Sequence, residues 1–404
     1  MIACVAAIGI GVSLRSGDTT PSGGKRVSAV RGPRFNVLPT SLSGRYHVPV
    51  VQVDADRAVV FGGVTWDTKN VSVANDGVTV DFAKKTSTVL AGPKLDDGLV
   101  RVRAAVSGSK VLFFGMECAS GPLPASFDGE GDVADPCVDG PLVLTTLDMR
   151  TAAWTDPVTA PAFVGGDVRW IDDASVVGHR AVIGWFESGR DTETFTAYDI
   201  RTGEWRALDS PPPGRLRDSC STRTHVVQVT YDDWSESAGG VPPPAPRLLL
   251  LDPNTGNWTS VAVPHQFGPA VGGLACTANH PVVYGTPAPS FATVLFAYSP
   301  ADATWRLLPT APHNLSAGDF HNLSPTRFAG IGDVIIGWRD PSELTAPSLL
   351  FQTIDLAQPE PRWSANATGP SAPVELATGS HGGGVAVTRA DDALYRIVVG
   401  GNRG

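Results

Sequence analysis

Short runs of β-branched and aromatic residues recur along the chain, and most of them contain or precede a Gly. The runs are VVFGG (59–63), LFFGM (112–116), AVIGW (181–185), VVQVT (226–230), VVYGT (282–286), VIIGW (334–338) and VAVTR (385–389). Another short apolar segment precedes each run, for example VPVVQV at 48–53. Runs of this length between turn residues are typical of β-strands. The pattern therefore predicts an all-β chain built from repeated strand pairs.

A second motif follows most of these pairs and predicts a β-hairpin. It reads LDMRTAAWTDP (147–157), YDIRTGEWRAL (198–208), LDPNTGNWTSV (251–261) and YSPADATWRLL (298–308). In the second copy, the carboxylate of Asp199 can accept hydrogen bonds from the turn backbone, and Gly203 allows a positive φ. Trp205 then opens the returning strand with a large side chain to bury. Each unit thus has four predicted strands.

The spacing of the hairpin motif predicts the architecture. The hairpin tryptophans are 51, 53, 47 and 58 residues apart, at Trp154, Trp205, Trp258, Trp305 and Trp363. Four-stranded units with a period near 50 residues indicate a β-propeller, and seven strand runs predict seven four-stranded blades.

The last unit lacks its own outer strand, because ALYRIVVG (393–400) follows VAVTR without a Trp hairpin. Near the start of the chain, FNVLPT (35–40) matches WRLLPT (305–310), with Phe35 in the Trp place. We expect this N-terminal strand to complete the last blade beside 393–399 and close the ring, which removes the unpaired edges of an open array.

The pattern resembles the kelch repeat, in the Gly62 and Gly63 pair of VVFGG and in the Tyr-Asp…Thr-Gly-x-Trp of 198–205. The resemblance covers about residues 31–404, although Ser87 stands where the first unit would have Trp. It implies the superfamily of the galactose-oxidase central domain. Copper enzymes of that type use Tyr and His ligands and a Tyr–Cys crosslink, and the sequence shows no matched set of these residues.

Composition agrees with many short strands, since the chain has 44 Gly, 34 Pro and only 18% charged residues. The net charge is −9, and six of the 31 basic residues are Lys. No basic stripe is present, so we expect no nucleic-acid partner.

The N-terminus predicts export. Residues 2–14 form an apolar run of 13 residues, short for a membrane span and suited to a signal or anchor core. Residues 1–14 are thus read as a signal or anchor remnant, 15–30 as a flexible linker rich in Gly, Ser, Thr and Pro, and 31–404 as the propeller. The expected location is extracytoplasmic, secreted or tethered, with membrane contact only through this segment. The alternative is a disordered apolar terminus.

Four cysteines suggest two disulfides. Cys220 and Cys276 each precede the matching Val of their runs by six residues, so they occupy corresponding positions on adjacent blades. Two buried free thiols are the alternative. Cys118 and Cys137 bracket a long loop that a second disulfide would close. Both bonds require an oxidising compartment.

That loop is also a candidate calcium site, because its carboxylates alternate with glycines. They are Asp128, Glu130, Asp132, Asp135 and Asp139. The spacing matches no EF-hand, and a solvated acidic loop is the alternative. No other cofactor is expected.

The loops that join second to third and fourth to first strands share one face of a propeller, and aromatic residues collect there. The candidate ligand-binding residues are Trp66, Tyr231, Trp234, Trp338, His313 and His321. Aromatic side chains beside Asp, Asn and Arg suit sugar stacking or burial of a peptide side chain. Trp185 and Trp338 directly follow their strands, and covering the blade edges is an alternative role for both. The two His residues could instead hold a metal.

We expect a non-catalytic binding propeller that recognises a protein or glycan through this face. The alternative is a carbohydrate-active enzyme on the same fold, either a galactose-oxidase-like oxidase or a lyase or hydrolase. A structural spacer is a third reading. The sequence contains no G-x-S-x-G motif and no phosphate-binding Gly loop, and it assigns no catalytic residue.

Overall fold

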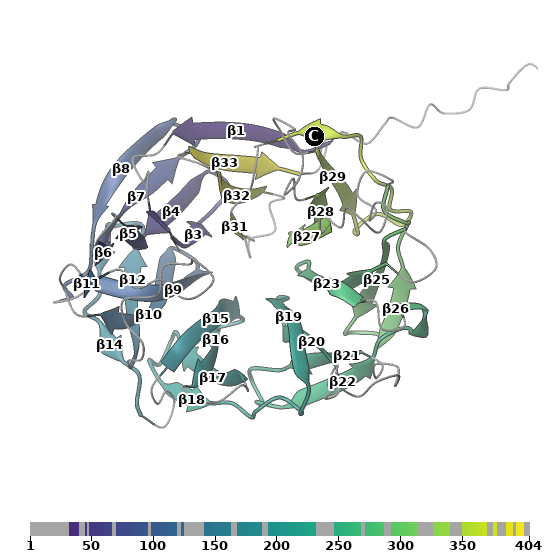
Figure 1. Cartoon of the computed structure of the whole chain (residues 1–404), viewed down its shortest axis with the longest axis horizontal. Helices are drawn as coiled ribbons and strands as arrows, with labels where there is room; N and C mark the ends of the chain where they lie inside the picture. Colours follow the sequence, from purple (N-terminus) through teal and green to yellow (C-terminus); the bar gives the residue numbers. More distant parts are fainter. Residues whose placement is uncertain are drawn as a thin grey trace, which may run out of the picture.

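A computed structural model describes most of the repetitive region. The described residues are 32–39, 45–46, 48–66, 70–95, 98–118, 123–124, 141–162, 168–187, 193–231, 246–267, 271–286, 292–312, 326–339, 350–369, 375–377, 385–390 and 393–399. The sheets are arranged radially around a central axis, as the ring in Figure 1 shows. Besides strands, these residues contain one short 3-10 turn, His265–Phe267.

Six blades of four strands each make up most of the ring. In each blade the strands are given from the central axis outward. Blade one has β3 (Val50–Gln52), β4 (Arg57–Phe61), β7 (Asp76–Asp81) and β8 (Thr86–Ala91). Blade two has β15 (Val168–Val177), β16 (Arg180–Glu187), β17 (Glu193–Asp199) and β18 (Trp205–Ala207). Blade three has β19 (Arg215–Ser221), β20 (Val226–Tyr231), β21 (Arg247–Leu251) and β22 (Trp258–Ala262).

The other three blades follow the same order. Blade four has β23 (Val271–Cys276), β24 (Pro281–Gly285), β25 (Val294–Ser299) and β26 (Thr304–Leu307). Blade five has β27 (Thr326–Ile331), β28 (Val334–Arg339), β29 (Leu350–Asp355) and β30 (Ala367–Thr368). Blade six has β31 (Glu375–Ala377), β32 (Val385–Ala390), β33 (Ala393–Val398) and β1 (Arg34–Pro39).

The prediction of seven four-stranded blades is wrong, because the sheet between blades one and two has five strands. These are β9 (Gly98–Ser107), β10 (Lys110–Cys118), β12 (Leu142–Asp148), β13 (Ala153–Trp154) and β14 (Val158–Thr159). Both β13 and β14 pair with β12, so the outer strand is broken between them. The break contains Pro157, which has no N–H to donate to the ladder. The periodicity of the sequence did not reveal this interruption.

A small accessory sheet was also not predicted. It consists of β2 (Arg45–Tyr46), β5 (Val64–Trp66), β6 (Asn70–Val73) and β11 (Leu123–Pro124), in the order β11-β6-β5-β2. Its strands come from the connections before β3, between β4 and β7, and between β10 and β12. Arg45 fastens this sheet to blade one through a 2.8 Å ion pair with Asp76.

The N-terminal strand closes the ring, and this prediction is confirmed. β1 pairs antiparallel with β33, with Phe35 opposite Ile397 and Pro39 opposite Ala393. The ring of Phe35 packs against Phe351 of blade five, with 4.9 Å between the ring centroids. Phe35 thus fills the gap between blades that the hairpin tryptophans fill elsewhere.

The hairpin tryptophans bind each sheet to the one before it. In four of them the indole Nε1 donates to the backbone carbonyl of an outer-strand segment in the preceding sheet. The pairs are Trp154 to Ala91 (2.7 Å), Trp258 to Asp209 (2.8 Å), Trp305 to Ala262 (3.1 Å) and Trp363 to Pro309 (3.0 Å). Each acceptor lies four residues beyond the Trp position of its own hairpin.

Trp205 departs from this pattern, since its buried Nε1 has no hydrogen-bond partner in the part of the chain that the structure describes. By the four-residue offset its acceptor would be Val158. Val158 lies in β14, beyond the break in the outer strand. The break therefore accounts for the unpaired indole.

The disulfide predicted between Cys220 and Cys276 is confirmed, with their Cα atoms 5.7 Å apart. It joins the innermost strands of blades three and four. Cys118 ends β10, but its side chain and Cys137 lie outside the described part of the chain, so the second disulfide stays a prediction. Among the described residues, no helix is long and apolar enough to span a membrane.

Candidate functional site

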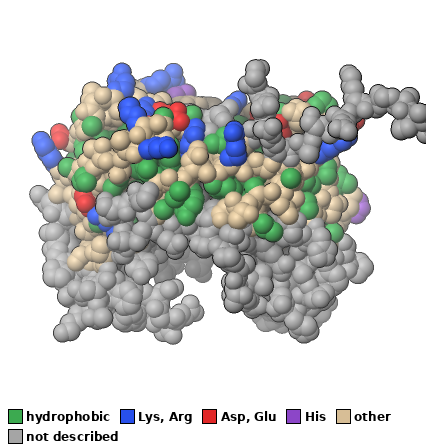
Figure 2. Space-filling model, turned by 90° about the horizontal axis from the view of Figure 1, so that it is seen from above, with side chains coloured by type: hydrophobic (Ala, Val, Ile, Leu, Met, Phe, Trp, Pro, Cys, Tyr) green, Lys and Arg blue, Asp and Glu red, His purple; other side chains and the backbone are tan. Residues whose placement is uncertain are grey.

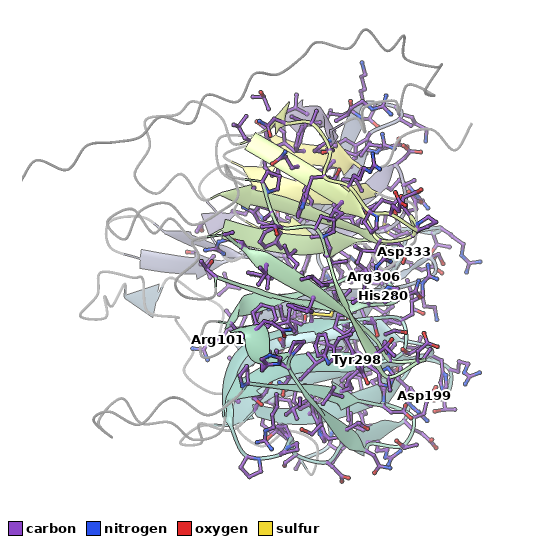
Figure 3. All side chains as sticks on the ribbon, turned by 90° about the vertical axis from the view of Figure 1, so that its right-hand side faces the viewer. Arg101, Asp199, His280, Tyr298, Arg306 and Asp333 are labelled. Atoms are coloured by element: carbon purple, nitrogen blue, oxygen red, sulfur yellow. A yellow bond between two sulfur atoms is a disulfide. The ribbon has the colours of Figure 1, made fainter. Side chains whose placement is uncertain are left out.

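The two ends of the ring differ in how the strands are connected. The turns between first and second strands, and between third and fourth strands, lie at one end, which we call the turn face. The opposite end, which we call the loop face, is where the second and third strands of a blade are joined, and β5, β6 and β11 of the accessory sheet come from described connections of this kind. Figure 3 shows Asp199, His280 and Asp333, all from turns at the turn face, on the same side of the molecule.

Polar side chains near the turn face hold neighbouring blades together. Arg206 in blade two donates to the carbonyl of Thr255 in blade three at 2.8 Å. Arg306 in blade four donates in the same way to Pro359 in blade five at 2.8 Å. On the outer wall in Figure 2, Lys and Arg side chains are interspersed with Asp, Glu and hydrophobic side chains. These contacts give the turn face a structural role.

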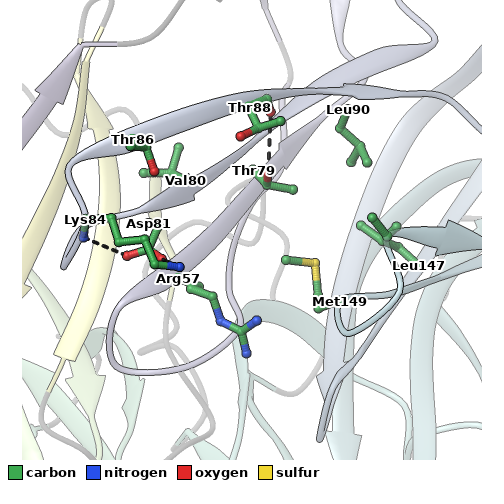
Figure 4. Close-up of a pocket in the computed structure, with 11 residues that line it drawn as sticks. Arg57, Thr79, Val80, Asp81, Lys84, Thr86, Thr88, Leu90, Leu147 and Met149 are labelled. Atoms are coloured by element: carbon green, nitrogen blue, oxygen red, sulfur yellow. Dashed lines mark hydrogen bonds and ion pairs between the residues drawn. The ribbon is translucent and has the colours of Figure 1, made fainter.

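A groove of about 220 Å³ lies on the outer wall between blade one and the five-stranded sheet (Figure 4). Two of its cationic side chains are already paired, Arg57 with Asp54 at 2.6 Å and Lys84 with Asp81 at 3.0 Å. Because both cations are already in ion pairs, they are less available to a charged ligand.

The sequence-predicted residues of the loop face are only partly described. Trp66 lies in β5 opposite Val71, and Tyr231 ends β20. The structure describes the backbone of both residues but not their side chains. The remaining candidates fall on undescribed residues; they are Trp234, His313, His321, Asp128, Glu130 and Asp132. Binding by all of these residues stays a prediction.

Trp338 belongs to an apolar cluster that also contains Ile397 of blade six. It is 7% exposed, and its ring stacks on Phe351 with the centroids 6.0 Å apart. Trp185 is buried in the same manner, with its Nε1 donating to Thr196 Oγ1 at 3.3 Å. Both placements match the alternative that these side chains cover blade edges.

Four acidic residues gather in the interior between blades two and three. Asp172 and Asp173 lie in β15, Asp218 lies in β19, and Glu193 begins β17. We call this group the carboxylate niche. The pairing of β15 slips at Asp172, and that of β19 slips just before Asp218. Irregularities of this kind redirect side chains, which explains why strand periodicity did not predict the niche.

Hydrogen bonds around the niche connect the innermost strands of successive sheets. Arg103 of β9 donates its Nε to the backbone carbonyl of Asp172 at 2.8 Å. The carboxylate of Asp172 accepts from Ser219 Oγ of β19 at 3.3 Å. The carboxylate of Asp218 accepts from the backbone N–H of Leu274 in β23 at 2.8 Å. Part of the polar chemistry of the niche therefore holds the ring together.

Glu193 is the most enclosed member, with only 5% of its surface exposed. Its Oε2 accepts a hydrogen bond from Nε2 of Gln228, which is itself buried in blade three. Among the described residues, its Oε1 has no hydrogen-bond partner. Oε1 lies against Gly184, where any side chain would overlap it, and Gly184 pairs with Asp173. Glu193 Oε1 therefore lies beside the backbone of Gly184, the residue that pairs with Asp173.

The niche shifts the protonation of its own members. Burial, and then the negative charges of Asp172 and Asp173, raise the pKa of Glu193 to about 9. Glu193 is therefore an uncharged carboxylic acid at neutral pH. Burial, and then the charge of Asp172, also raise the pKa of Asp173, while Arg103 opposes this shift. Crowded carboxyl groups in an enclosed space favour the neutral form or a nearby positive charge.

The niche is not recognisable as a metal centre. Within the described ranges, no group of three or more His, Cys, Asp and Glu side chains could hold a metal ion. Two sequence signals could have pointed to the niche. One is the Asp172–Asp173 pair within a predicted innermost strand, and the other is the Gln228 inside the apolar run VVQVT.

The radial sheets and the N-terminal closing strand define the chain as a β-propeller. No protein-family model matches the chain, and no curated protein sequence matches it. A chain in the crystal structure of the mitotic checkpoint complex is similar to it, with a TM-score of 0.51 and 9% identity. That alignment covers 95% of this chain and 99% of the other.

Two further solved structures are similar. The Dos1 propeller aligns with a TM-score of 0.48 and 10% identity, over 93% of this chain and 96% of the other. The β-propeller domain of the Trilobed protease from Pyrococcus furiosus aligns with a TM-score of 0.49 and 9% identity, over 86% and 90% of the two chains. At such low identities the similarity is one of fold alone. The kelch and galactose-oxidase resemblance finds no family match.

Proposed function

We propose that this propeller is a binding module that recognises a protein or glycan partner through its loop face. The accessory sheet is the observation that carries the proposal. Connections from three separate places in the chain converge there to build a folded surface outside the radial sheets. Function in repeated folds commonly lies in loops that a rigid scaffold positions.

The accessory sheet offers groups that a partner could reach. Thr65 and Ser72 face each other across β5 and β6, and Ser72 is exposed. In the described part of the sheet, β2 and β11 are its two terminal strands. A terminal strand presents backbone groups that can pair with an extended segment of another chain. The predicted aromatic residue Trp66 lies in the same sheet.

The same proposal places the protein outside the cytoplasm. The disulfide between Cys220 and Cys276 supports this, because such bonds persist in oxidising compartments. Tethering through residues 1–14 belongs to the proposal as well, and those residues lie outside the described part of the chain.

The test is a screen of the full chain against arrays of glycans and of extracellular proteins, followed by measured affinities for each hit. Ser72→Glu alters the exposed surface of the accessory sheet, and Thr151→Glu makes the same change of charge at an exposed position on the turn face. We expect Ser72→Glu to weaken binding by about tenfold or more, as the loss of a central interface contact does. Thr151→Glu should leave the affinity unchanged. Equal affinities for both variants, or loss only with Thr151→Glu, would refute a loop-face site.

A further inference from the structure

The outer strand of blade one, β8, presents a free backbone edge. The indole of Trp154 donates to the carbonyl of Ala91 at 2.7 Å, so this carbonyl points away from β7. Asp76, opposite Ala91 in β7, turns its own carbonyl toward the β4 side, which agrees. Residues two apart in a strand direct their backbone groups the same way, so the N–H and C=O groups of Ser87 and Val89 also point outward. Within the described part of the chain, no strand pairs with this edge.

β8 lacks the features that protect an edge strand. Its six residues, TSTVLA, carry no charge, and all but Leu90 are exposed. Val89 is 72% exposed, more than any other large hydrophobic side chain in the described ranges. Lys84 and Lys85 precede the strand, in the turn after β7, so their charges lie beside the edge and not along it. An uncharged, exposed edge of this length favours pairing with another strand.

The other outer strands among the described residues are short, charged or less exposed. β13, β14 and β30 have two residues each. β1 contains Arg34 and Pro39, β18 contains Arg206, and β26 contains Arg306. β22 resembles β8 most, with five uncharged residues, but its Val261 is partly buried. β8 is therefore the outer edge best suited to pair, and β22 serves as the comparison.

We propose that β8 pairs antiparallel with β8 of a second copy of this chain, about a two-fold axis that passes between the two Thr88 residues. In this register Ser87 of each copy lies opposite Val89 of the other, and each such pair exchanges two hydrogen bonds. All four free groups of each copy are then used. Figure 1 shows β8 on the outer wall of the ring, so the two blades become one continuous sheet between two rings. This interface is separate from the proposed recognition of a partner and does not depend on it.

The edge complements itself, and for this reason the partner is a second copy. A register centred on Thr88 needs only Ser87 and Val89 from each chain, whereas one centred on Val89 would need the Ala91 carbonyl, which Trp154 already occupies. No charged residue lies opposite another within the paired segment, because β8 has none. Contact with the partner strand also removes part of the exposed Val89 side chain from water. Since both copies use the same surface, the contact closes as a dimer.

The first test is sedimentation equilibrium of the full chain over a series of concentrations. Native protein should show a monomer–dimer equilibrium. Ser87→Pro removes an outward N–H that β7 does not use, and proline is tolerated at such positions on an edge strand. Ser260→Pro makes the same change in β22, where the Ala262 carbonyl accepts from the Trp305 indole and Ser260 therefore also faces outward.

We expect Ser87→Pro to weaken the dimer by at least about tenfold, because each of the two copies loses a donor. Ser260→Pro should leave the dissociation constant unchanged, and far-UV circular dichroism checks that both variants keep the fold. Native protein that stays monomeric at every concentration would overturn the proposal, since only a strand of another protein could then occupy the edge. Equal dissociation constants for native protein and Ser87→Pro, or equal weakening by both variants, would also overturn it.

Cysteine crosslinking tests the register without the use of proline. Opposed Cα atoms at a non-hydrogen-bonded pair lie about 4.5 Å apart, within the range of a disulfide. Thr88→Cys should therefore form a covalent dimer on mild oxidation, seen on a non-reducing gel. Val89→Cys is the matched control, because in this register its two copies lie two residues out of step and should not crosslink. Crosslinks in both variants, in neither, or in Val89→Cys alone would refute the pairing about Thr88.

Discussion

The hairpin tryptophans provide a sharp test of how the ring is held together. Trp258 donates its indole Nε1 to the Asp209 carbonyl at 2.8 Å, whereas the Nε1 of Trp205 is buried with no partner among the described residues. Replacing each by Phe removes a similar part of the ring system from a similar aromatic contact. Trp258 packs on Phe195 with centroids 5.2 Å apart, and Trp205 packs on Tyr198 at 5.0 Å. The two variants therefore differ mainly in the hydrogen bond.

The expected difference follows from the energetics of hydrogen bonds. Trp258→Phe loses one bond to a neutral carbonyl, worth about 1 kcal/mol, because water can solvate the exposed acceptor residue Asp209. Trp205→Phe loses no bond and removes a buried, unsatisfied donor, a gain of about 1 kcal/mol. We therefore expect Trp258→Phe to be less stable than Trp205→Phe by about 2 kcal/mol, after the shared loss of packing is subtracted.

The assay is equilibrium urea denaturation of the native protein and both variants, followed by far-UV circular dichroism. If the free energy of unfolding falls equally steeply with urea in each protein, each exposes the same surface on unfolding, and the midpoints then report stability. If Trp205→Phe is as destabilised as Trp258→Phe, the reasoning is refuted and the indole–carbonyl bonds do not carry the inter-blade energy.

Three further predictions follow from described features. Replacing both Cys220 and Cys276 by Ser should lower the free energy of unfolding by about 4 kcal/mol, given their separation of 56 residues in the chain; unchanged thermal midpoints in oxidised and reduced native protein would contradict this. Deleting residues 32–39 exposes the edge of β33, so we expect the protein to associate or aggregate, which light scattering would detect. A monodisperse monomer with native stability would refute ring closure as a stabilising element. The pKa of Glu193 rises from 4.5 to about 9 on folding, so the folded chain holds a proton that the unfolded chain releases between these values. The proton on Glu193 therefore stabilises the fold at low pH, and this contribution to the free energy of unfolding is lost as pH rises toward 9, by up to about 1.4 kcal/mol per pH unit. Urea denaturation at several pH values should show no such loss for Glu193→Gln. An equal dependence on pH in both proteins would refute the assignment.

Sequence patterns predicted the features that recur from one repeat unit to the next. The Asp…Gly-x-Trp spacing around Trp205 identified a hairpin, and Phe35 in the Trp place identified the closing strand. Corresponding positions in adjacent repeats also predicted the disulfide from Cys220 to Cys276. In each case the repeat itself brings the partners together.

The features that were missed depend on distant or irregular pairings. Pro157 breaks an outer strand, and its effect reaches Trp205 in the next blade only through the missing acceptor. The accessory sheet pairs Leu123 with Val71, two residues in different connections that share no sequence signal. The niche depends on a register slip at Asp172, which a strictly alternating strand pattern cannot show.

Closure of the ring through β1 and β33 also has a consequence for how the protein is made. Arg34 pairs with Val398, so the first described strand leaves the ribosome long before its partner does. Every other strand can find its neighbours within its own unit or the next, by contacts of short sequence separation that form quickly. Among the described strand pairs, this final pairing brings together segments from opposite ends of the repeat array, with the largest loop-closure entropy. Until then the edge of β33 is exposed, and the completed chain is most prone to misassembly in the interval before that last strand docks.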